Sequence, residues 1–503
     1  MHEIITVQLG QAGNYLGTHF WNTQESYLTY ADDDPISPVS PDIHWRPGQG
    51  VDGTETFLPR TVIYDLKGGF GSLGTINTLY DSTRDWDVPI PWERTPVLHK
   101  LPEVPQIAYQ QSLNAGDAMP KLTSSQVRYW SDFSRVYYHP KSFNQVYEYE
   151  LNSSIRPFDK WSLGEDLFQS LDKGHDVMDR DLRPFIEEAD HMQAIQIFTA
   201  LDDAWGGFAA QYLDRMRDEY PKTTLWTWGT QASHQGLLQR LNLSRSIVAI
   251  SNQASMLVPI SLPEGLLPSN TCVARNSPWE LSALMSTALE TAGLASRLRQ
   301  AEVRRSLGDV VARINTNGRQ AIARLRMTPS ELKEAPHEVD PQLSPQRGYF
   351  DSEPHVIEFF NVNRRRGRPE SRKAPSPSRV FGQSTTFRTS DESLESIDVG
   401  HGSHSPHWAR GEKNYQDHIC VPFPILDSFP EIYKDRHGNP MSEAIGVTST
   451  LCTDTSISGA MGQLRKSVAP FLPAEDREAT IHELSELAEA FDEGWSSDDS
   501  STE

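Results

Sequence analysis

The opening of the chain, residues 4–21, has the sequence IITVQLGQAGNYLGTHFW and constrains the fold more than any other stretch. Residues 4–9 form a β-rich apolar run, and the spacing of Ala12, Leu16 and Phe20 predicts a helix over residues 11–28. Gly10 and Gly13 flank the turn between them. Backbone N–H groups at a helix N-terminus bind phosphate, but a tight turn also requires glycine. The turn is therefore either a nucleotide loop or a purely structural connection.

Strand and helix patterns continue to alternate after this opening. A second apolar run ends at Asp65 and is followed by a glycine-rich loop. Further elements are predicted as strands at 192–201, 223–230 and 245–252, and as helices at 165–189 with an interruption near Lys173, at 208–220, at 278–299 and at 474–491. This alternation predicts an α/β fold with a mainly parallel sheet.

Three segments break the pattern. Residues 85–122 are rich in proline and predict an extended surface insertion. Residues 329–410 are first basic and then acidic, and predict a largely disordered linker with ordered islands at 355–362 and 380–387. Residues 492–503 form an acidic tail with too few apolar side chains for a packed core.

Composition excludes several functional classes. The net charge of −22 argues against direct nucleic-acid binding, which depends on phosphate neutralisation by basic side chains. Three cysteines are too few for a disulfide framework. We expect no transmembrane segment, because no run approaches the roughly 20 apolar residues that span a bilayer. The start of the chain also lacks the pattern of a signal peptide.

Two clusters in the linker region could bind a ligand. His401, His404 and His407, followed by His418 and Cys420, have metal-ligand residue types, but we favour a polar linker and predict no metal site. The segment 364–379 contains seven basic residues and is interpreted first as plain linker. Contact with anionic lipid, at about 1 kcal/mol per basic residue, or with an acidic partner segment is the alternative.

Several motifs resemble those of tubulins. EIITVQLGQAGNYLGTHFW is similar to the tubulin opening, and FLPRTVIYDLKGGFGS is similar to the segment with the second nucleotide loop. YYHPKSF and EEADHMQAIQIFTAL also resemble tubulin stretches. Within that superfamily, WSDFSRVYYHPKS, VFGQSTTFR and HELSELAEAFDEG are more similar to the Misato family, which is linked to mitochondrial distribution and to inheritance of mitochondrial DNA.

This resemblance implies a tubulin/FtsZ-like body and a domain organisation. Residues 1–220 correspond to a nucleotide-binding-type domain that contains the proline-rich insertion. Residues 221–328 correspond to a second half with long helices. The linker 329–410 and a C-terminal region 411–503, with its terminal helix and acidic tail, complete the chain.

The resemblance also implies positions for a nucleotide site that would hold GTP or GDP with Mg²⁺. Gly10, Gln11 and Gly13 match the first tubulin loop, and Asp65 matches the first acid of the second loop. Lys67 replaces the second acid of that loop, and a lysine cannot bind Mg²⁺. Asp65 is equally well explained as a residue that caps the turn after its strand.

The third tubulin loop, a glycine-rich run, is not reproduced. At this place the chain has Asp202, Asp203, Ala204 and Trp205 before Gly206 and Gly207. Two carboxylates would repel phosphate, and the indole would prevent the close backbone approach that glycine permits. Asp202 and Asp203 could hold a bridging cation, but paired acids more often lie at a solvated helix N-terminus.

Two other family positions are uncertain or changed. Asn252 in SNQA resembles a tubulin asparagine that contacts the nucleoside, although a helix-capping role explains it as well. Asp309 matches the first acid of the loop that activates hydrolysis in the next tubulin subunit. Ala312 occupies the place of the catalytic glutamate, so no general base is expected and we predict that the chain is not an enzyme.

The resemblance implies a non-catalytic protein that partitions mitochondria and their DNA and maintains mitochondrial distribution and shape. It is expected in the cytoplasm and at the mitochondrial outer surface, with membrane-associated proteins and the tubulin cytoskeleton as candidate partners. A divergent GTPase and a tubulin-binding assembly factor are the alternatives.

Overall fold

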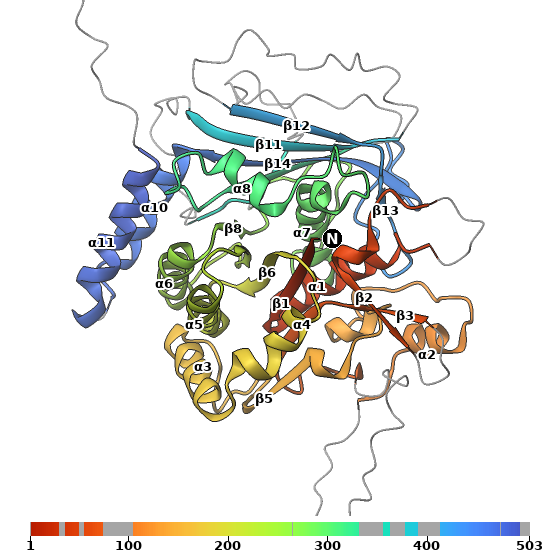
Figure 1. Cartoon of the computed structure of the whole chain (residues 1–503), viewed down its shortest axis with the longest axis horizontal. Coiled ribbons are helices and arrows are strands. Elements are labelled where there is room, and N and C mark those ends of the chain that lie inside the picture. Colours follow the sequence, from red (N-terminus) through yellow and green to blue (C-terminus); the bar gives the residue numbers. More distant parts are fainter. Residues whose placement is uncertain are drawn as a thin grey trace, which may run out of the picture.

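The computed structural model describes residues 2–29, 36–49, 55–73, 104–263, 265–330, 356–362, 378–390, 413–472 and 474–492. Within these ranges the chain forms two large sheets, with helices between and around them (Figure 1). A small antiparallel pair, β2 (Trp45–Gln49) and β3 (Glu55–Pro59), lies beside the first large sheet.

The first sheet has six parallel strands in the order β5-β4-β1-β6-β7-β8. They are β1 (Glu3–Leu9), β4 (Thr61–Lys67), β5 (Phe143–Glu150), β6 (Met192–Ala200), β7 (Thr224–Thr230) and β8 (Met256–Ile260). All seven side chains of β1 are buried, as expected for a parallel strand that is covered on both faces. The predicted parallel α/β sheet is confirmed.

Helices cover both faces of this sheet and begin at its carboxyl edge. The two helices α1 (Gly10–Glu25) and α7 (Pro278–Gly293) pack on one face, where Leu16 and Phe20 of α1 meet Ile4 of β1. The other face is covered by α3 (Trp161–His175), α5 (Ala204–Glu219) and α6 (Leu237–Gln253). The sequence stabilises the N-terminus of α7, because the Ser277 side chain accepts a hydrogen bond from the Glu280 amide and Pro278 occupies the first helical position.

The second sheet has the order β10-β9-β14-β11-β12. Its strands are β9 (Arg324–Ser330), β10 (Ile357–Glu358), β11 (Val380–Arg388), β12 (Lys413–Ile419) and β14 (Ala444–Asp454), and the short β13 (Phe423–Pro424) pairs with β14. All neighbours are antiparallel except β11 and β12. Between the two sheets lie α7 and α8 (Leu307–Ile314), as Figure 1 shows.

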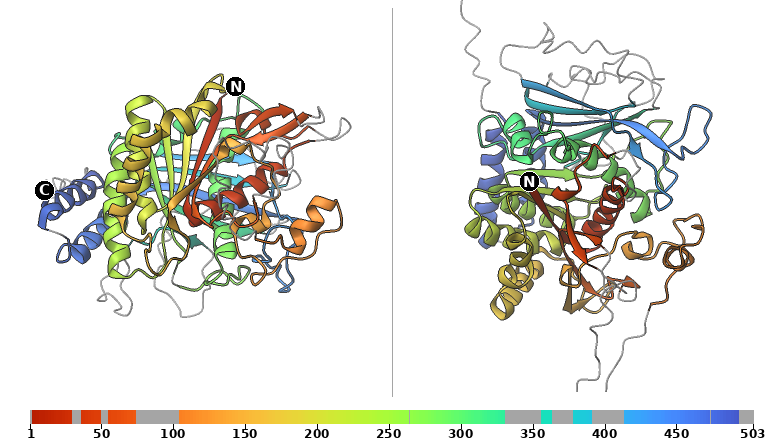
Figure 2. Two further views of the ribbon diagram at one scale, coloured as in Figure 1. Left: turned by 90° about the horizontal axis from the view of Figure 1, so that it is seen from below. Right: turned by 45° about the vertical axis from the view of Figure 1, so that its right-hand side comes forward.

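The terminal helix is confirmed. It is α11 (Ala474–Ala490), and it pairs with α10 (Ser456–Val468). Figure 2 shows this pair standing beside the body, against α6. The acidic tail from residue 493 onward lies outside the described residues.

One predicted strand is wrong. Residues 245–252 lie inside α6. Leu243, Ile247 and Ile250 are buried at helical spacing, between the first sheet and the α10–α11 pair. Because this helix is covered on more than one side, its apolar run is nearly continuous and its periodicity does not distinguish it from a strand.

The proline-rich insertion contains a helix that its composition did not predict. The described part of the insertion includes α2 (Ala108–Ala115), and residues 74–103 lie outside the described ranges. Gln110 is fully buried on this helix and its amide group donates to the carbonyl oxygens of Ser131, Asp132 and Ser134, at 3.0, 2.9 and 2.8 Å. This tertiary contact holds α2 on the body.

The helix predicted over residues 165–189 is interrupted as expected, a few residues after Lys173. Helix α3 ends at His175, Asp176 has a φ of +47°, and a π-helical turn (Met178–Leu182) leads into α4 (Arg183–Glu187). Both ordered islands of the linker are present as β10 and β11, and β11 is an interior strand of the second sheet. The remaining linker residues, 331–355, 363–377 and 391–410, lie outside the described ranges, as do residues 411–412 of the C-terminal region.

Candidate functional site

The candidate site lies at the carboxyl edge of the first sheet, where the loops after β1, β4 and β6 meet. Ligands of open parallel α/β sheets bind at this edge, because all strands end there and helices begin there. The first loop leads from Leu9 directly into α1, the second follows Lys67, and the third precedes α5.

Gly10 and Trp205 are in direct contact across this edge. Gly10 has a φ of +71°, and a Cβ atom added to it would lie 2.3 Å from Nε1 of the Trp205 indole. The indole is only 4% exposed and packs against Phe158 and Phe208, with ring centroids 5.3 and 5.4 Å apart. The side chain that replaces a glycine of the third loop therefore occupies the space against the first loop.

Gly13 is required by the packing of α1 on the sheet. A Cβ atom at this position would lie 2.4 Å from the carbonyl oxygen of Phe198 in β6. Gln11 does not point toward an open phosphate site. Its amide donates to Asp65 Oδ2 at 2.6 Å and to the Gly69 carbonyl at 3.0 Å, so it joins the first loop to the second.

Asp65 is the centre of this connection and is completely buried. Its Oδ2 accepts from Gln11, from Asn14 Nδ2 at 2.7 Å and from Trp130 Nε1 at 3.0 Å, while its Oδ1 accepts from the Leu66 amide at 2.8 Å. Burial raises the pKa of Asp65 to about 6, although these hydrogen bonds favour the charged form. Because four protein donors already surround it, the carboxylate holds the loops together and has little capacity left to bind a metal.

Lys67 is half-buried at the end of β4, and its carbonyl accepts a hydrogen bond from the Leu151 amide. The second loop continues through Gly69, where an added Cβ would lie 2.4 Å from the Asp65 carboxylate. This close approach explains why the loop after Asp65 is rich in glycine.

The paired acids of the third loop both bind backbone amides. Asp202 Oδ2 accepts from the Ala232 amide at 2.9 Å. Asp203 is the N-cap of α5 and its Oδ1 accepts from the Trp205 amide at 2.8 Å. Burial, reinforced by the neighbouring Asp202, raises the pKa of Asp203 to about 7. The arrangement favours the helix-start interpretation of these acids over a cation bridge.

Gly206 and Gly207 lie in the first turn of α5 and permit close helix packing. An added Cβ would lie 2.1 Å from Ser246 Oγ at Gly206, and 2.0 Å from the Trp161 carbonyl oxygen at Gly207. These glycines therefore bring α5 against α6 and α3. The tubulin-type phosphate cradle that the family implies at this loop is replaced by a packed helix start.

Asn252 is not part of this cluster. It is exposed near the end of α6, just before β8 begins, and so lies at the amino edge of the sheet. The match of SNQA to tubulin was too short to locate it correctly. Asp309 lies in the first turn of α8, where its Oδ2 accepts from the amide and hydroxyl of Ser306 at 2.8 and 2.7 Å. This acid caps a helix, and Ala312 carries no group for proton transfer.

In the described part of the chain, no group of three or more His, Cys, Asp or Glu side chains is arranged so that it could hold a metal ion. His401, His404 and His407 lie outside it, whereas His418 in β12 stacks on Phe387 at 4.6 Å. The basic segment lies outside it up to residue 377. No helix in the described ranges is long and apolar enough to cross a bilayer.

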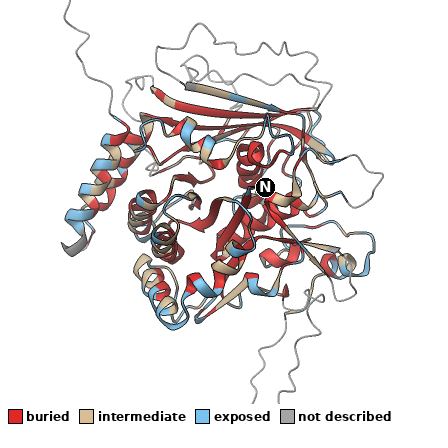
Figure 3. Cartoon of the chain, in the orientation of Figure 1, coloured by how far each residue is buried: buried red, intermediate tan, exposed pale blue. Residues whose placement is uncertain are grey.

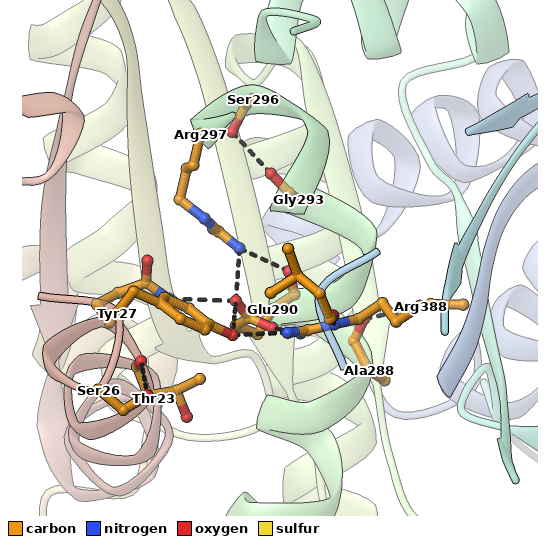
Figure 4. A network of polar contacts seen from close by, with 12 residues as sticks. Thr23, Ser26, Tyr27, Ala288, Glu290, Gly293, Ser296, Arg297 and Arg388 are labelled. Carbon is orange, nitrogen blue, oxygen red and sulfur yellow. Dashed lines mark hydrogen bonds and ion pairs between the residues drawn. The ribbon is translucent and has the colours of Figure 1, made fainter. Parts of the chain in front are cut away.

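The sequence did not reveal a buried charged network between the two halves of the molecule (Figure 4). Glu290 of α7 is fully buried. Its Oε1 accepts from Arg297 Nη2 at 2.9 Å and Tyr27 Oη at 3.2 Å, and its Oε2 is paired with Arg388 of β11. Arg388 also donates to Tyr27 Oη at 2.7 Å and to the Val421 carbonyl at 2.7 Å. Arg297 is seven residues from Glu290, but Tyr27 and Arg388 are 263 and 98 residues away from it, and only the fold brings them together.

Trp130 and Asn14 were also missed, although both bind the predicted Asp65. The WSDF motif that contains Trp130 was noted for its resemblance alone, and its 3₁₀ turn (Trp130–Phe133) delivers the indole to the carboxylate. No sequence pattern predicts that an indole N–H and a side-chain amide will donate to a carboxylate so far away along the chain. Together these residues turn the candidate site into a closed, internally hydrogen-bonded edge.

Comparison with known proteins adds independent information. A family model described as Misato Segment II tubulin-like domain matches residues 2–115, and one described as Tubulin domain matches residues 119–298. The chain is 44% identical to Protein DML1 of Gibberella zeae over 98% of both chains. It is 44% identical to Protein dml-1 of Neurospora crassa, over 99% of this chain and 98% of that one. It is 25% identical to Protein misato homolog 1 of Bos taurus over 98% of both.

Proposed function

Because the chain belongs to the DML1/Misato family of tubulin-like proteins, we propose that it partitions mitochondria and their DNA as a scaffold that does not hydrolyse GTP. Membership confirms the family resemblance seen in the sequence. The mitochondrial role is the one that this resemblance implies. We propose that the protein acts in the cytoplasm and at the mitochondrial outer surface, with membrane-associated proteins as partners.

The contact between Trp205 and Gly10 carries the non-catalytic part of the proposal. In a phosphate loop, backbone N–H groups must be free to approach the ligand. Here the indole lies where a Cβ at Gly10 would be, and Gln11 and Asp65 are hydrogen-bonded to each other. A nucleotide could enter only if this packed edge rearranged.

The absence of a general base supports the same conclusion. Asp309 is committed to the capping box of α8, and Ala312 follows where tubulins activate water with a glutamate. A second copy of this chain would therefore bring no catalytic carboxylate from this helix to the first.

Calorimetric titration of the full chain with GTP and GDP in the presence of Mg²⁺ tests the non-catalytic part. Purified tubulin serves as the positive control. We expect no saturable heat from wild-type protein. The variant Trp205→Ala removes the indole from Gly10, and Trp226→Ala, which removes another buried indole, is its matched control. Binding by Trp205→Ala alone would show that the indole closes the site.

Micromolar binding by the wild-type chain, with slow turnover, would overturn the non-catalytic proposal and favour a divergent GTPase. The cellular part is tested separately in Neurospora crassa that lacks its own family member. The chain should restore mitochondrial distribution and mitochondrial DNA content. If it restores neither and instead binds tubulin saturably without nucleotide, a tubulin-binding assembly factor is the better description.

A further inference from the structure

The outer face of the second sheet is defined as the face opposite the one on which α7 and α8 pack. This outer face is buried along the central strands β11 and β14, whereas its outward side chains are half-buried on β9 and partly exposed on the edge strand β12. Ser449 of β14 donates to the Ala288 carbonyl of α7, which identifies the inner face. The neighbouring positions of β14 therefore point outward, because side chains alternate along a strand. Cys452, Thr450 and Thr448 are such outward residues.

The outward residues of the central strands are almost inaccessible. Cys452 is 0% exposed and Thr450 is 2% exposed. On β11, Thr385 pairs with Thr450 and Phe387 pairs with Thr448, and each is 3% exposed. In Figure 3 both strands are coloured as buried almost throughout. A sheet face in contact with solvent would leave such side chains partly exposed. Some further part of the protein therefore lies over β11 and β14 on this face.

The unpaired atoms on this face indicate that its cover is polar. Four buried atoms here have no hydrogen-bond partner: Arg324 Nε and Thr328 Oγ1 of β9, Gln383 Oε1 of β11 and Asn414 Oδ1 of β12. A buried polar atom without a partner costs about 1–3 kcal/mol, so such atoms are usually satisfied by protein or water. Four on one face point to a polar chain rather than an apolar one.

Strand directions identify which segment must cross the sheet. The strands β9 and β10 are antiparallel neighbours, so residues 331–355 leave and return at one end of the sheet. Residues 363–377 run from the end of β10 to the start of β11, which also lie at one end, opposite to the first. By contrast β11 and β12 are parallel, so residues 391–412 must travel back along the whole length of the paired strands. That path is about 20 Å long.

Handedness indicates the face over which this connection passes. The Thr389 amide donates to the Ile419 carbonyl, so β12 lies to the right of β11 when the outer face is viewed with β11 running upward. In an L-residue whose strand runs upward and whose side chain points toward the viewer, the backbone N–H points to the right. Thr389 is such an outward residue, so the strand that accepts from its amide lies to the right. A connection over the outer face is then right-handed, as about 98% of such connections are.

We propose that the outer face of the second sheet is a docking surface for residues 391–412 of the same chain. This segment contains Ser393, Ser396, Ser403 and Ser405 and three histidines, whose O–H and N–H groups suit the unpaired oxygens of the face. Four of its acids, Asp391, Glu392, Glu395 and Asp398, offer acceptors for Arg324 Nε. The other two guanidinium nitrogens of Arg324 are already paired with Glu358 and Asp454. The acidic half of the linker is thus a structural part of the second sheet and not a free spacer.

Cys452 is a natural probe of this cover. Its thiol lies on the outer face and burial raises its pKa to about 11, whereas Cys272 and Cys420 are exposed. In a Cys272→Ser/Cys420→Ser background, Cys452 is the one remaining thiol and its rate of maleimide labelling reports the accessibility of the face. We expect labelling of the intact chain to be at least tenfold slower than that of Cys272 in wild-type protein.

The second chain in this experiment has residues 391–412 replaced by a glycine-serine linker of equal length, which can span the sheet but offers few side chains. Labelling of Cys452 should then accelerate at least tenfold. The matched control is Ser449→Cys in a background without other cysteines, because Ser449 lies on the same strand, is 1% exposed and faces α7. The thiol introduced there should stay protected in both chains.

Three results would overturn the proposal. Rapid labelling of Cys452 in the intact chain would show that the face is open. Protection of Cys452 in both chains would show that something other than residues 391–412 covers it. Equal acceleration at Cys452 and at the thiol introduced by Ser449→Cys would show that the segment supports the whole fold and not this face.

Discussion

The charged network around Glu290 gives the most demanding test of how the two sheets are held together. Glu290 lies on α7 between them, and its partners Arg297 and Arg388 are 2% and 1% exposed. Burial lowers the pKa of Arg297 despite the neighbouring carboxylate. Burial also acts to lower the pKa of Arg388, but Glu290 and Tyr27 outweigh it and the net shift is upward. Both guanidinium groups therefore depend on one buried carboxylate.

Glu290→Gln keeps the shape and one acceptor oxygen of this side chain but removes its charge. Two buried guanidinium groups then have no anionic partner in the network, because the Tyr27 hydroxyl that accepts from Arg388 is neutral. Removing one partner of a buried ion pair costs about 3–5 kcal/mol. Since the net stability of proteins is about 5–15 kcal/mol, this loss is a large fraction of the total.

Urea unfolding, followed by tryptophan fluorescence and far-ultraviolet circular dichroism, measures the effect. Glu489→Gln on the exposed face of α11 is the matched control and should change stability by less than about 0.5 kcal/mol. Adding Arg388→Met to Glu290→Gln removes one of the two uncompensated charges, so the double variant should lose less than the sum of the single losses. If Glu290→Gln is as stable as the Glu489→Gln control, the network does not hold the sheets together and the reasoning is refuted.

Three further predictions follow from the carboxyl edge. Asp203→Asn keeps an N-cap acceptor but cannot ionise. Because the folded pKa of Asp203 is raised to about 7, wild-type protein should lose stability relative to this variant as pH rises from about 4 through 7. Urea midpoints that differ equally at pH 4 and pH 8 would contradict this expectation. Gly207→Ala should lower the melting temperature by forcing α5 away from α3, whereas Gly462→Ala in α10, where nothing lies within 4 Å of an added Cβ, should raise stability by up to about 1 kcal/mol. Gly10→Ala combines a clash with Trp205 and a strained backbone worth about 1–2 kcal/mol, so adding Trp205→Ala should not restore its melting temperature to that of Trp205→Ala alone.

Local patterns in the sequence predicted most of the first half of the fold. The strand, glycine turn and helix at residues 4–25 are as expected, because a buried parallel strand and an amphipathic helix have distinct periodicities. The resemblance to the third tubulin loop placed Trp205 where a glycine is expected and predicted that it obstructs a nucleotide, and its contact with Gly10 agrees with that reasoning. Whether the edge binds a nucleotide stays a prediction.

Each of the three incorrect sequence predictions has its own cause. The strand predicted at residues 245–252 is a helix because an apolar run buried on several sides loses its period. The helix α2 was hidden in a proline-rich segment because the contacts that hold it, through Gln110, come from residues 131–134. Asn252 was assigned to the site by a short match, although its place before β8 puts it at the opposite edge of the sheet.

The sequence by itself determined the family, the parallel α/β body and the loss of the glycine-rich third loop, since these depend on residue type and order along the chain. The tertiary structure alone decided that Asp65 is surrounded by Gln11, Asn14 and Trp130, and that Glu290 lies between Arg297 and Arg388. Such contacts join residues up to 98 positions apart in the case of Glu290 and Arg388. A hydrogen bond or ion pair depends on distance and direction in space, and neither is written in the local pattern of a chain.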